Sequence, residues 1–489
     1  MKKSILLIIV SFILIYNVKA QTINYDSLRN EIKTYREILK HSHTGLNLYT
    51  SEKQFDSLFN KLDKDLPKIK TRRDYYLRLC EIHTFIRCGH SSMYNVPLTE
   101  NDIIKEILPF KIKFLGNKAY VENSYCEIKK GSEIVSINGH LISEIIKEAF
   151  KLISSDGYNT SFKYRILESD FNSYYFLIFG KTNTCKIHYT EYHTNSRKIL
   201  DISTKQEDYN IGKEPNIEKT FDDIYNLKVI NNNTALLTVN SFDTPTKKLT
   251  KRYFKFLKKA FKTIKKKDIK NLIIDIRENT GGNDGNDMEL ASYIINKPFK
   301  ENKYRIIKHL NLVSHSELLS PYLNDMLGID NDTPKSEIAK MMNKEVKKEF
   351  ENKAHADGYY YLKEEKVIKR KPKKNRFKGN IYIMTSGNVF SGGGLFSALV
   401  RDKSDAIFVG EETGGGYYRH TGSIPLIYEL PYSKIPFSIF TVINEQDVDQ
   451  KLFPKGTGTI PHYKVHQNPD ELVNNIDAVL NKCLELIKK

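Results

Sequence analysis

Residues 385–400, TSGNVFSGGGLFSALV, place a serine between a strand-like run and a helix-like run, and three glycines follow it. A side chain at the start of a helix lies beside free backbone N–H groups and the positive end of the helix dipole. Ser391 is therefore a candidate nucleophile, and the N–H of Gly392 is a candidate donor to a tetrahedral oxyanion. Plain N-capping by Ser391 is the alternative, and Ser386 is a second candidate hydroxyl. The signature G-x-S-x-G of α/β-hydrolases is absent because position 389 is valine.

A second polar stretch, IIDIRENTGGNDGND at 273–287, follows a run of buried-strand character. Polar residues at the end of a buried strand are typical of ligand-binding or catalytic loops in α/β folds. The pair Gly281-Gly282 is a candidate source of a second N–H for an oxyanion. A tight turn with an ion pair between Asp275 and Arg277 is the alternative interpretation.

A histidine ends the helical pattern that runs from Arg72 to His90. With an ordinary pKa near 6.5, His90 suits a general base at neutral pH, and a histidine held by a helix C-terminus is the alternative. His83 lies seven residues earlier, but two histidines without a third ligand do not predict a metal site, and the motif HExxH is absent. We therefore expect no metal and no cofactor.

The elements that must position these residues change in kind along the chain. Residues 25–95 repeat apolar side chains at helical spacing, whereas 96–205 contains alternating and β-branched runs that predict strands, among them YYFLIFG at 174–180. From about 228 onward, strands and helices alternate, which predicts an α/β layer architecture. The Lys/Glu-rich segment 340–378 is expected to be an exposed insertion. The end of the chain, from the N-cap Asn468, is expected to form a helix.

The composition limits the class of protein. Residues 1–20 begin with Lys2 and Lys3, continue with an apolar run and end at a small-residue cleavage site that includes Lys19. This pattern predicts a secretory signal peptide and a mature chain without a membrane span. The formal net charge is +18, and it falls to +15 without the three lysines of the signal. Because no nucleic-acid motif accompanies this charge and the chain is expected to be exported, we expect a solvated surface and no nucleic-acid partner. Five scattered cysteines form no CxxC pair.

Several motifs, taken together, resemble those of one known family. CGHSS, GSEIVSINGHLISEI, IIDIRENTGG, IYIMTSGNVFSGGG and IFVGEETGG occur in the order and rough spacing of the tail-specific (C-terminal processing) serine peptidases. The first motif resembles the branch that includes the tricorn core and the interphotoreceptor retinoid-binding protein. The resemblance covers most of the mature chain. It implies a crotonase/ClpP-like α/β catalytic core in 206–489, an N-terminal helical domain in 21–95 and a PDZ-like β-rich domain in 96–205.

The resemblance also bears on how the serine is activated. One branch of the family places a lysine in a turn that matches Thr413–Gly416 here, and the lysine position is occupied by Gly416. The other branch uses a histidine from the N-terminal region, which matches His90. The resemblance therefore implies a Ser391–His90 mechanism with Gly392, Gly281 and Gly282 as oxyanion donors.

The acid that orients the histidine is left open among Glu445, Asp447 and Asp449, of which we name Asp449. The resulting hypothesis is an exported serine endopeptidase, periplasmic or outside the cell, that hydrolyses peptides or unfolded polypeptides. A binding protein with degraded catalysis on the same scaffold is the alternative. The sequence does not indicate an oligomeric state.

Overall fold

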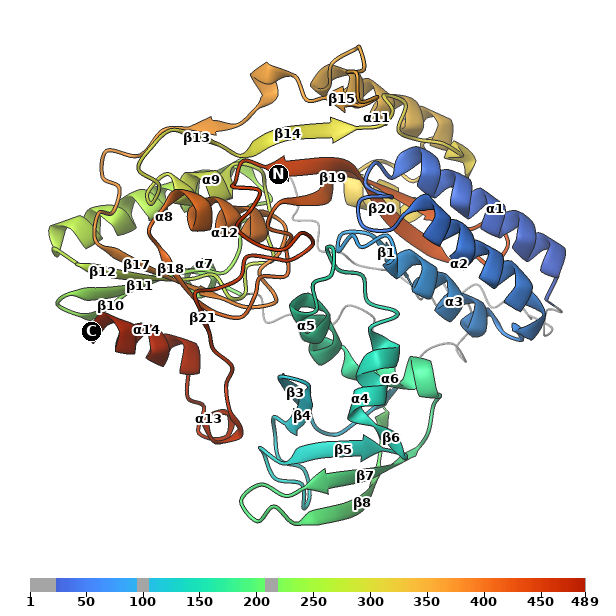
Figure 1. Cartoon of the computed structure of the whole chain (residues 1–489), viewed down its shortest axis with the longest axis horizontal. Coiled ribbons are helices and arrows are strands. Elements are labelled where there is room, and N and C mark those ends of the chain that lie inside the picture. Colours follow the sequence, from blue (N-terminus) through green and yellow to red (C-terminus); the bar gives the residue numbers. More distant parts are fainter. Residues whose placement is uncertain (1–22, 95–104, 207–218, 489) are drawn as a thin grey trace.

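The computed structural model describes residues 23–94, 105–206 and 219–488. These residues form three groups of elements (Figure 1): helices at the N-terminus, a β-rich unit in the middle of the chain, and a large α/β body built from the rest. The signal peptide expected at 1–20 lies outside the described residues. Among the described helices, none has both the length and the apolar character that a membrane span requires.

The N-terminal group consists of α1 (Tyr25–Ser42), α2 (Glu52–Asp65) and α3 (Arg72–Thr84). Each helix begins at a side-chain cap, from Asn24, Ser51 and Thr71 respectively. Their apolar faces do not form a core of their own, because they share one hydrophobic cluster with strands from the C-terminal half of the chain. The helical group is therefore anchored on the α/β body.

The β-rich unit is a sheet in the order β3-β4-β5-β7-β8, with β6 paired to β5 and with three helices covering it. Its core draws buried side chains from both the strands and the helices. Its elements are β2 (Glu106–Ile107), β3 (Ile112–Leu115), β4 (Lys118–Val121), β5 (Glu133–Ile137), β6 (His140–Leu141), α4 (Ile142–Ala149), α5 (Ser161–Ser169), α6 (Phe171–Phe179), β7 (Thr184–Thr190), β8 (Arg197–Ser203) and β9 (Lys205–Gln206).

The central sheet of the α/β body has six strands in the order β10-β11-β12-β17-β18-β21. All neighbours from β11 to β21 are parallel, and β10 is an antiparallel edge strand. The strands are β10 (Tyr225–Asn231), β11 (Thr234–Val239), β12 (Asn271–Asp275), β17 (Asn380–Thr385), β18 (Ile407–Gly410) and β21 (Tyr463–Lys464). Because β12 and β17 are parallel neighbours, the loops that follow them meet at one edge of the sheet.

Helices cover both faces of this sheet. On one face lie α8 (Lys247–Lys266), α9 (Asn286–Ala291) and α12 (Gly392–Lys403), and α14 (Ala478–Lys488) lies on the other (Figure 1). The short α7 (Phe221–Ile224) precedes β10, and α13 (Pro469–Val473) precedes α14. This layered arrangement confirms the α/β class that strand–helix alternation predicts.

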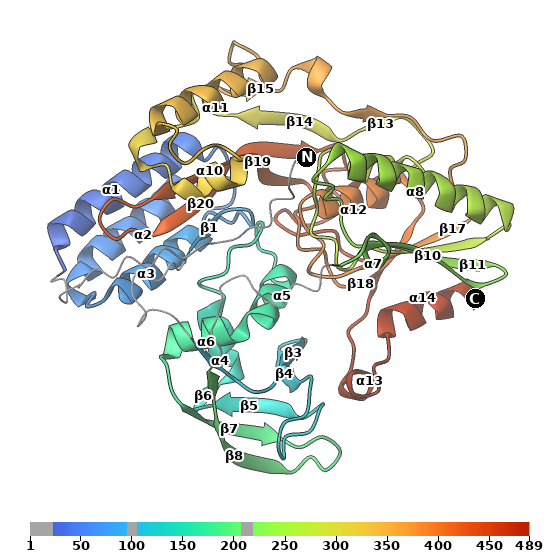
Figure 2. The same ribbon diagram turned by 180° about the vertical axis from the view of Figure 1, so that it is seen from behind.

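A second sheet joins the α/β body to the N-terminal helices. Its long strands β19 (Arg419–Glu429) and β20 (Pro436–Gln446) form a hairpin, and β14 (Asn302–Ile307), β15 (Tyr360–Tyr361) and β1 (Ser92–Met93) complete it. Seen from behind (Figure 2), α10 (Pro321–Leu327) and α11 (Lys335–Glu349) lie beside the N-terminal helices on this sheet. The pairing of β1 with β20 joins the N-terminal segment to the catalytic half, with Ser92 opposite Ser438.

Three expectations from the sequence are wrong in part or in full. Residues 174–180 were expected to form a strand, but they lie in α6, which buries Phe171, Tyr175 and Phe176 at helical spacing against the β-rich core. The C-terminal helix is interrupted between α13 and α14, where Asn475 takes a left-handed conformation. The segment 340–378 is exposed only in part, because α11 and the residues after it bury Val346 and Phe350.

The remaining short elements are β13 (Phe299–Lys300), β16 (Lys369–Arg370) and the 3₁₀ turns η1 (Leu66–Lys68), η3 (Ser316–Leu318) and η4 (Glu364–Lys366).

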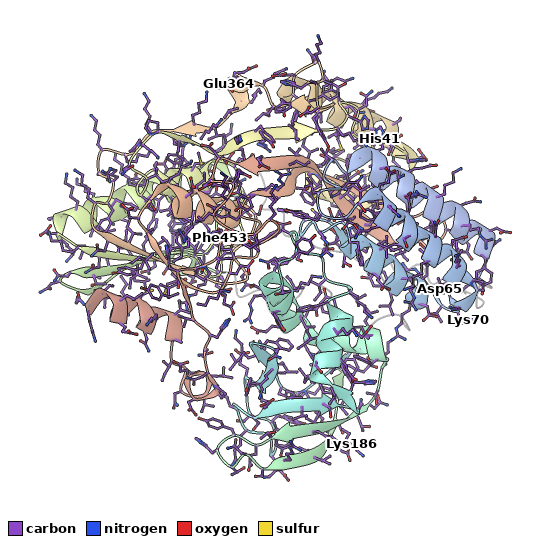
Figure 3. The ribbon with its side chains drawn as sticks, viewed as in Figure 1. His41, Asp65, Lys70, Lys186, Glu364 and Phe453 are labelled. Atoms are coloured by element: carbon purple, nitrogen blue, oxygen red, sulfur yellow. The ribbon has the colours of Figure 1, made fainter. Side chains whose placement is uncertain are left out.

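The charged side chains lie mostly on the outside of the molecule. Lys70, Lys186 and Glu364 are exposed and point away from the ribbon at its rim (Figure 3). All five cysteines have free thiols in this structure, and Cys126 alone among them is exposed. The lysine excess is thus spread over solvated faces, as the composition predicts.

Candidate active site

Ser391 lies at the start of α12 but does not cap it. Its side chain makes no hydrogen bond to the free N–H groups of the first turn. Its backbone has φ 49° and ψ −123°, a combination that residues with a Cβ rarely adopt. A strained turn between a strand and a helix that exposes a serine Oγ is the geometry of a nucleophile elbow. N-capping is therefore not the role of Ser391 in this structure.

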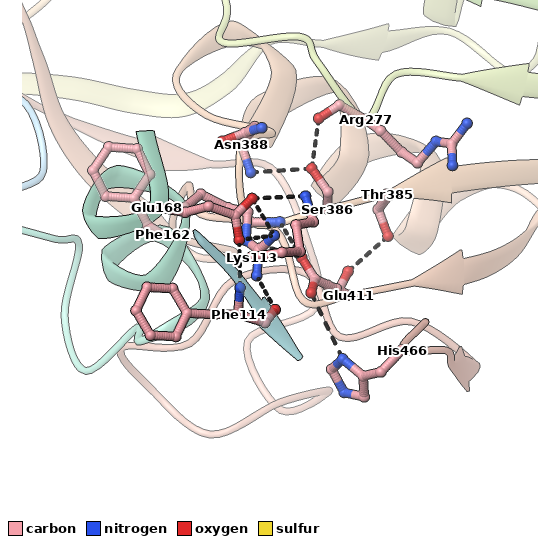
Figure 4. A network of polar contacts seen from close by, with 12 residues as sticks. Lys113, Phe114, Phe162, Glu168, Arg277, Thr385, Ser386, Asn388, Glu411 and His466 are labelled. Atoms are coloured by element: carbon pink, nitrogen blue, oxygen red, sulfur yellow. Dashed lines mark hydrogen bonds and ion pairs between the residues drawn. The ribbon is translucent and has the colours of Figure 1, made fainter. Parts of the chain in front are cut away.

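The other candidate nucleophile, the hydroxyl of Ser386, is hydrogen-bonded to the backbone. Its Oγ donates to the carbonyl of Arg277 at 2.5 Å and accepts from the N–H of Asn388 at 3.1 Å. Figure 4 shows Ser386 between these partners, beside a network in which Glu411 accepts from the N–H of Gly387 and approaches His466. These bonds hold the loop after β17 in place, so Ser386 has a structural role.

The turn after β12 packs directly against Ser391. A Cβ on Gly281 would lie 2.7 Å from the Cβ of Ser391 and 2.8 Å from the nitrogen of Gly392, so this approach requires glycine. The N–H of Gly281 donates to Oδ1 of Asn279 at 2.9 Å. The N–H groups of Gly392 and Gly282 have no acceptor among the described residues. They lie close together, because a Cβ on Gly392 would be 3.6 Å from the nitrogen of Gly282.

His90 lies six residues beyond the end of α3, in the bend that leads into β1. Its ring packs against Phe390, Phe440 and His420, with centroids 4.5, 5.2 and 5.5 Å away. Loss of solvent around the ring, followed by repulsion from His420, lowers the pKa of His90 to about 3. His90 is therefore neutral at physiological pH and has a free lone pair to accept a proton.

Ser391 and His90 line the same cavity, of about 220 Å³. Gly282 and Gly392 also border it, so the nucleophile candidate, the histidine and both free N–H groups meet in one place. The structure shows no direct hydrogen bond between Ser391 and His90, and a looser spacing is common before substrate binds. The fold thus brings together residues that are 301 positions apart in the chain.

The carboxyl group nearest to His90 belongs to Asp156, which lies in the connection between α4 and α5. An oxygen of Asp156 lies within 4.8 Å of a ring nitrogen of His90 and of the sulfur of Cys88. Its Oδ1 accepts from the N–H of Gly89 at 2.8 Å, and its Oδ2 accepts from the N–H of Gly416 at 3.1 Å. Burial raises the pKa of Asp156 to about 7, although both amide bonds lower it in part. Asp156 thus links the β-rich unit, the segment of His90 and the turn after β18.

We expect Asp156→Asn to destabilise the protein at pH 8 by about 1–3 kcal/mol, because its amide NH₂ must face one of the two backbone N–H groups. Chemical denaturation of the variant and of wild type measures this difference in the free energy of unfolding. Asp201→Asn, an exposed change on β8, is the control and should stay within about 0.5 kcal/mol. Equal stability of Asp156→Asn and wild type would contradict the two-amide contact.

The three acids considered from the sequence lie elsewhere. Glu445 is buried and forms an ion pair with Arg419 at 2.6 Å, and Asp447 lies 3.4 Å from Lys403. Asp449 is exposed, and its carboxylate accepts from the N–H of Lys451. None of the three borders the cavity that holds Ser391 and His90. The structure therefore does not bring Asp449 to the histidine.

The trio of Cys88, His90 and Asp156 is compact enough to be considered as a metal site. However, both oxygens of Asp156 already accept backbone N–H groups, and the Cys88 thiol donates to the carbonyl of Thr421 at 3.4 Å. Burial raises the pKa of that thiol to about 12, so it stays protonated and is a poor ligand. The Asp156 carboxylate and the Cys88 thiol are therefore better suited to supporting the segment of His90 than to binding a metal ion.

Several residues of the cavity were not identified from the sequence. His420 on β19 and Phe440 on β20 flank the ring of His90, and Asp287, Glu301 and Arg305 also border the cavity. The long hairpin of β19 and β20 was itself missed. The alternation in RHTGSIPLIYE and PFSIFTVINEQ is the signal that could have revealed both strands.

A comparison with models of known protein families matches the part of the chain that carries Ser391. The model of peptidase family S41 matches residues 233–465, which include Ser391, the Gly281-Gly282 turn and the parallel strands β11, β12, β17, β18 and β21 of the central sheet. Residues 233–465 belong to peptidase family S41. The match assigns the chain to the serine-type peptidases, and it confirms the family resemblance of the sequence motifs. A comparison with curated proteins found no match.

The solved structures of CPAF share the fold of this chain at low sequence identity. The structure of mature CPAF complexed with lactacystin aligns with a TM-score of 0.65 at 12% identity, over 94% of this chain and 97% of that one. Mature CPAF alone aligns with a TM-score of 0.62 at 11% identity, over 94% and 96%. The photosystem II D1 C-terminal processing protease aligns with a TM-score of 0.39 at 10% identity, over 94% and 97%. The likeness to CPAF extends over the helical and β-rich parts as well as the core.

Proposed function

We propose that the chain is an exported serine endopeptidase in which Ser391 is the nucleophile and His90 is the general base. The observation that carries this proposal is the uncapped, strained Ser391, which shares a cavity with a neutral His90 and two free N–H groups. Peptides and unfolded polypeptides are the proposed substrates. Export, to the periplasm or beyond the cell, rests on the signal-like residues 1–20.

The proposed reaction has two halves. His90 takes the proton from Ser391 Oγ as the oxygen attacks the peptide carbonyl, and the tetrahedral intermediate collapses as His90 passes that proton to the leaving amine. The C–N bond breaks, and an acyl ester remains on Ser391. Water then attacks the ester, again with His90 as base, which releases the carboxyl product and restores the serine hydroxyl.

The N–H groups of Gly392 and Gly282 are the proposed oxyanion donors. Both lack acceptors among the described residues, and preorganised donors of this kind stabilise developing charge without reorganisation. Gly281 contributes in another way, since its N–H is committed to Asn279 and its missing side chain leaves room for Ser391. Asp156 is proposed to position His90, in place of the acids considered from the sequence.

The β-rich unit is proposed to be PDZ-like and to hold or gate the polypeptide. It contacts the loops after β18 directly, since Arg165 lies 3.7 Å from Glu411 and the Asn159 side-chain amide donates to the carbonyl of Thr413 at 2.7 Å. A movement of the β-rich unit would therefore displace the loops that flank Ser391. Whether it recognises C-termini is a separate question that binding of C-terminal peptides would answer.

A fluorophosphonate probe tests the proposed nucleophile. We expect labelling of the wild-type protein, loss of labelling in Ser391→Ala and weaker labelling in His90→Ala. Circular dichroism and thermal unfolding serve to show that each variant is folded. A folded wild type that takes up no label, and that digests no unfolded protein, would instead favour a binding protein on this scaffold.

The pH dependence of labelling follows from the state of His90. Its pKa is lowered in the folded protein to about 3, so the base is present above that value and is lost only as the pH falls through it. We expect the acid limb of kcat/KM, and of the labelling rate, to lie below pH 6.5. Asp156 titrates nearby with a pKa of about 7, so the profile is also measured on Asp156→Asn. An inflection at or above pH 6.5 that persists in this variant would contradict a His90 that is neutral at physiological pH.

A further inference from the structure

Part of the wall of the cavity that holds Ser391 and His90 carries two acidic side chains. Asp287 lies in α9, and Glu301 lies between β13 and β14, and both border the cavity together with Ser391 and Gly392. Asp287 is 2% exposed and Glu301 is 3% exposed. Acidic side chains are rarely buried to this extent unless they are paired.

Three of the four carboxyl oxygens on this wall lack a hydrogen-bond partner. Both oxygens of Asp287 and Oε1 of Glu301 are buried without one, and Oε2 of Glu301 accepts weakly from the amide of Asn302 at 3.3 Å. Backbone N–H groups at the start of α9 lower the pKa of Asp287 slightly without forming bonds of normal geometry. Burial nevertheless raises the pKa of Asp287 to about 7, and burial together with Asp287 raises that of Glu301 well above its usual range.

The other charged groups of the cavity do not neutralise this pair. Arg305 borders the cavity, but its guanidinium is 3.2 Å from Asp284 and donates to Ser423 Oγ. The two histidines that border the cavity, His90 and His420, have lowered pKa values and are neutral. Arg305 is thus paired with Asp284. Its charge also lowers the pKa of Glu301, but neither Asp287 nor Glu301 forms an ion pair with a cation among the described residues.

We propose that this wall binds the basic side chain, lysine or arginine, of a residue next to the peptide bond that is cleaved. The proposal rests on the peptidase function above, and it adds the substrate class. An ammonium or guanidinium group between Asp287 and Glu301 would form charge-assisted hydrogen bonds with oxygens that otherwise lack partners. The cavity volume of about 220 Å³ exceeds the roughly 150 Å³ that is sufficient to enclose benzene, so such a side chain fits.

Two other interpretations of this acidic wall are weaker. A divalent metal ion needs several oxygens that converge, but no trio of ligand atoms that includes Asp287 or Glu301 lies within 4.8 Å among the residues the structure describes. A proton shared between the two carboxyl groups would stabilise an empty cavity, as in other carboxyl pairs. In that case the wall would be neutral and would not prefer a basic side chain, which makes this interpretation an outcome of the test.

The first experiment is digestion of reduced, carboxymethylated casein by the full chain, with the cleavage sites mapped by mass spectrometry. Peptides around a favoured site are then compared in isosteric pairs, lysine with norleucine and arginine with citrulline. We expect kcat/KM to fall by about 100-fold or more when the charge is removed, because the buried oxygens are then left unpaired. Cleavage without any preference for the basic member of each pair would overturn the proposal while leaving the peptidase function intact.

The second experiment measures binding without catalysis. In the Ser391→Ala protein, benzamidine should raise Tm by about 1 °C or more at several times its Kd, whereas the neutral benzamide should not. Asp287→Asn and Glu301→Gln should abolish this shift, and both should still react with the fluorophosphonate probe when Ser391 is present. Glu345→Gln, an exposed change on α11, is the control for loss of an acidic charge.

Each outcome of the two experiments bears on one claim. Labelling and digestion with no response to benzamidine and no basic preference would refute the substrate class alone. Absence of labelling and digestion, with a benzamidine shift that depends on Asp287, would refute the peptidase and keep the cation site. If Ca²⁺ or Mg²⁺ raised Tm and displaced benzamidine, the wall would be a metal site and the proposal would be wrong.

Discussion

Replacing Ser391 by alanine is expected to lower kcat for digestion of unfolded protein by at least about 10⁴-fold, because loss of a catalytic serine removes the covalent path entirely. The remaining activity would come from the oxyanion donors and from substrate binding. The structure predicts little change in stability, since Ser391 Oγ caps no helix and accepts no hydrogen bond among the described residues. A large loss of activity with an unchanged Tm is therefore the signature of a nucleophile.

The control for this variant is Ser386→Ala, in the same loop. Ser386 bonds to the backbone at Arg277 and Asn388, so its loss should cost about 1 kcal/mol of stability and leave the chemistry in place. Assays at a temperature well below both Tm values keep the comparison free of unfolding. If Ser386→Ala lost activity as Ser391→Ala is expected to, and Ser391→Ala retained it, the assignment of the nucleophile would be wrong.

Replacing His90 by alanine is expected to lower kcat by a similar factor, about 10⁴-fold, because Ser391 is then left without a base to take its proton. The double variant with Ser391→Ala should be no less active than either single variant, since residues that act as a unit are not additive. Single-turnover kinetics on a favoured peptide would measure all three variants under the same conditions.

A structural loss at His90 must be separated from a catalytic one. The ring packs among Phe390, Phe440 and His420, so His90→Ala leaves a hole beside the cavity and some stability will be lost. Exogenous imidazole can enter such a hole and should restore part of the activity. His355→Ala, a surface change at an ion pair with Glu351, is the control. Activity that imidazole does not restore, in a folded His90→Ala protein, would contradict a role as base.

The local patterns in the sequence predicted the secondary structure correctly where the pattern lies within a single helix or strand. The strand within NLIIDIR, the helix that contains LFSALVRD and the cap at Asn468 all depend on short-range periodicity and turn chemistry, and the structure confirms them. The strand expected at 174–180 failed for the opposite reason. A short apolar run is compatible with either helix or strand, and packing of Phe171, Tyr175 and Phe176 against the β-rich core decides for the helix.

The order of the motifs indicates the class of reaction. It combines a serine, two glycine loops and a histidine, and these residue types limit the reactions that Ser391 and His90 can perform together. The absence of a lysine at Gly416 is likewise a property of the sequence. Neither the partner of His90 nor the acidic wall could be found this way. Asp156, which is proposed to position His90, accepts from the N–H groups of Gly89 and Gly416, which come from two other segments of the chain.

The residue types therefore indicate the peptidase family and the proposed chemistry, because motifs on single loops report local geometry. The assembly of the site depends on long-range pairing. The contact between β1 and β20 brings His90 across 301 positions to Ser391, and the parallel neighbours β12 and β17 place the two glycine loops side by side. The connection between β13 and β14 then brings Glu301 to the same cavity, which Asp287 of α9 also borders. Such pairings follow from the burial of whole faces against one another, a property of the complete chain that no short segment contains.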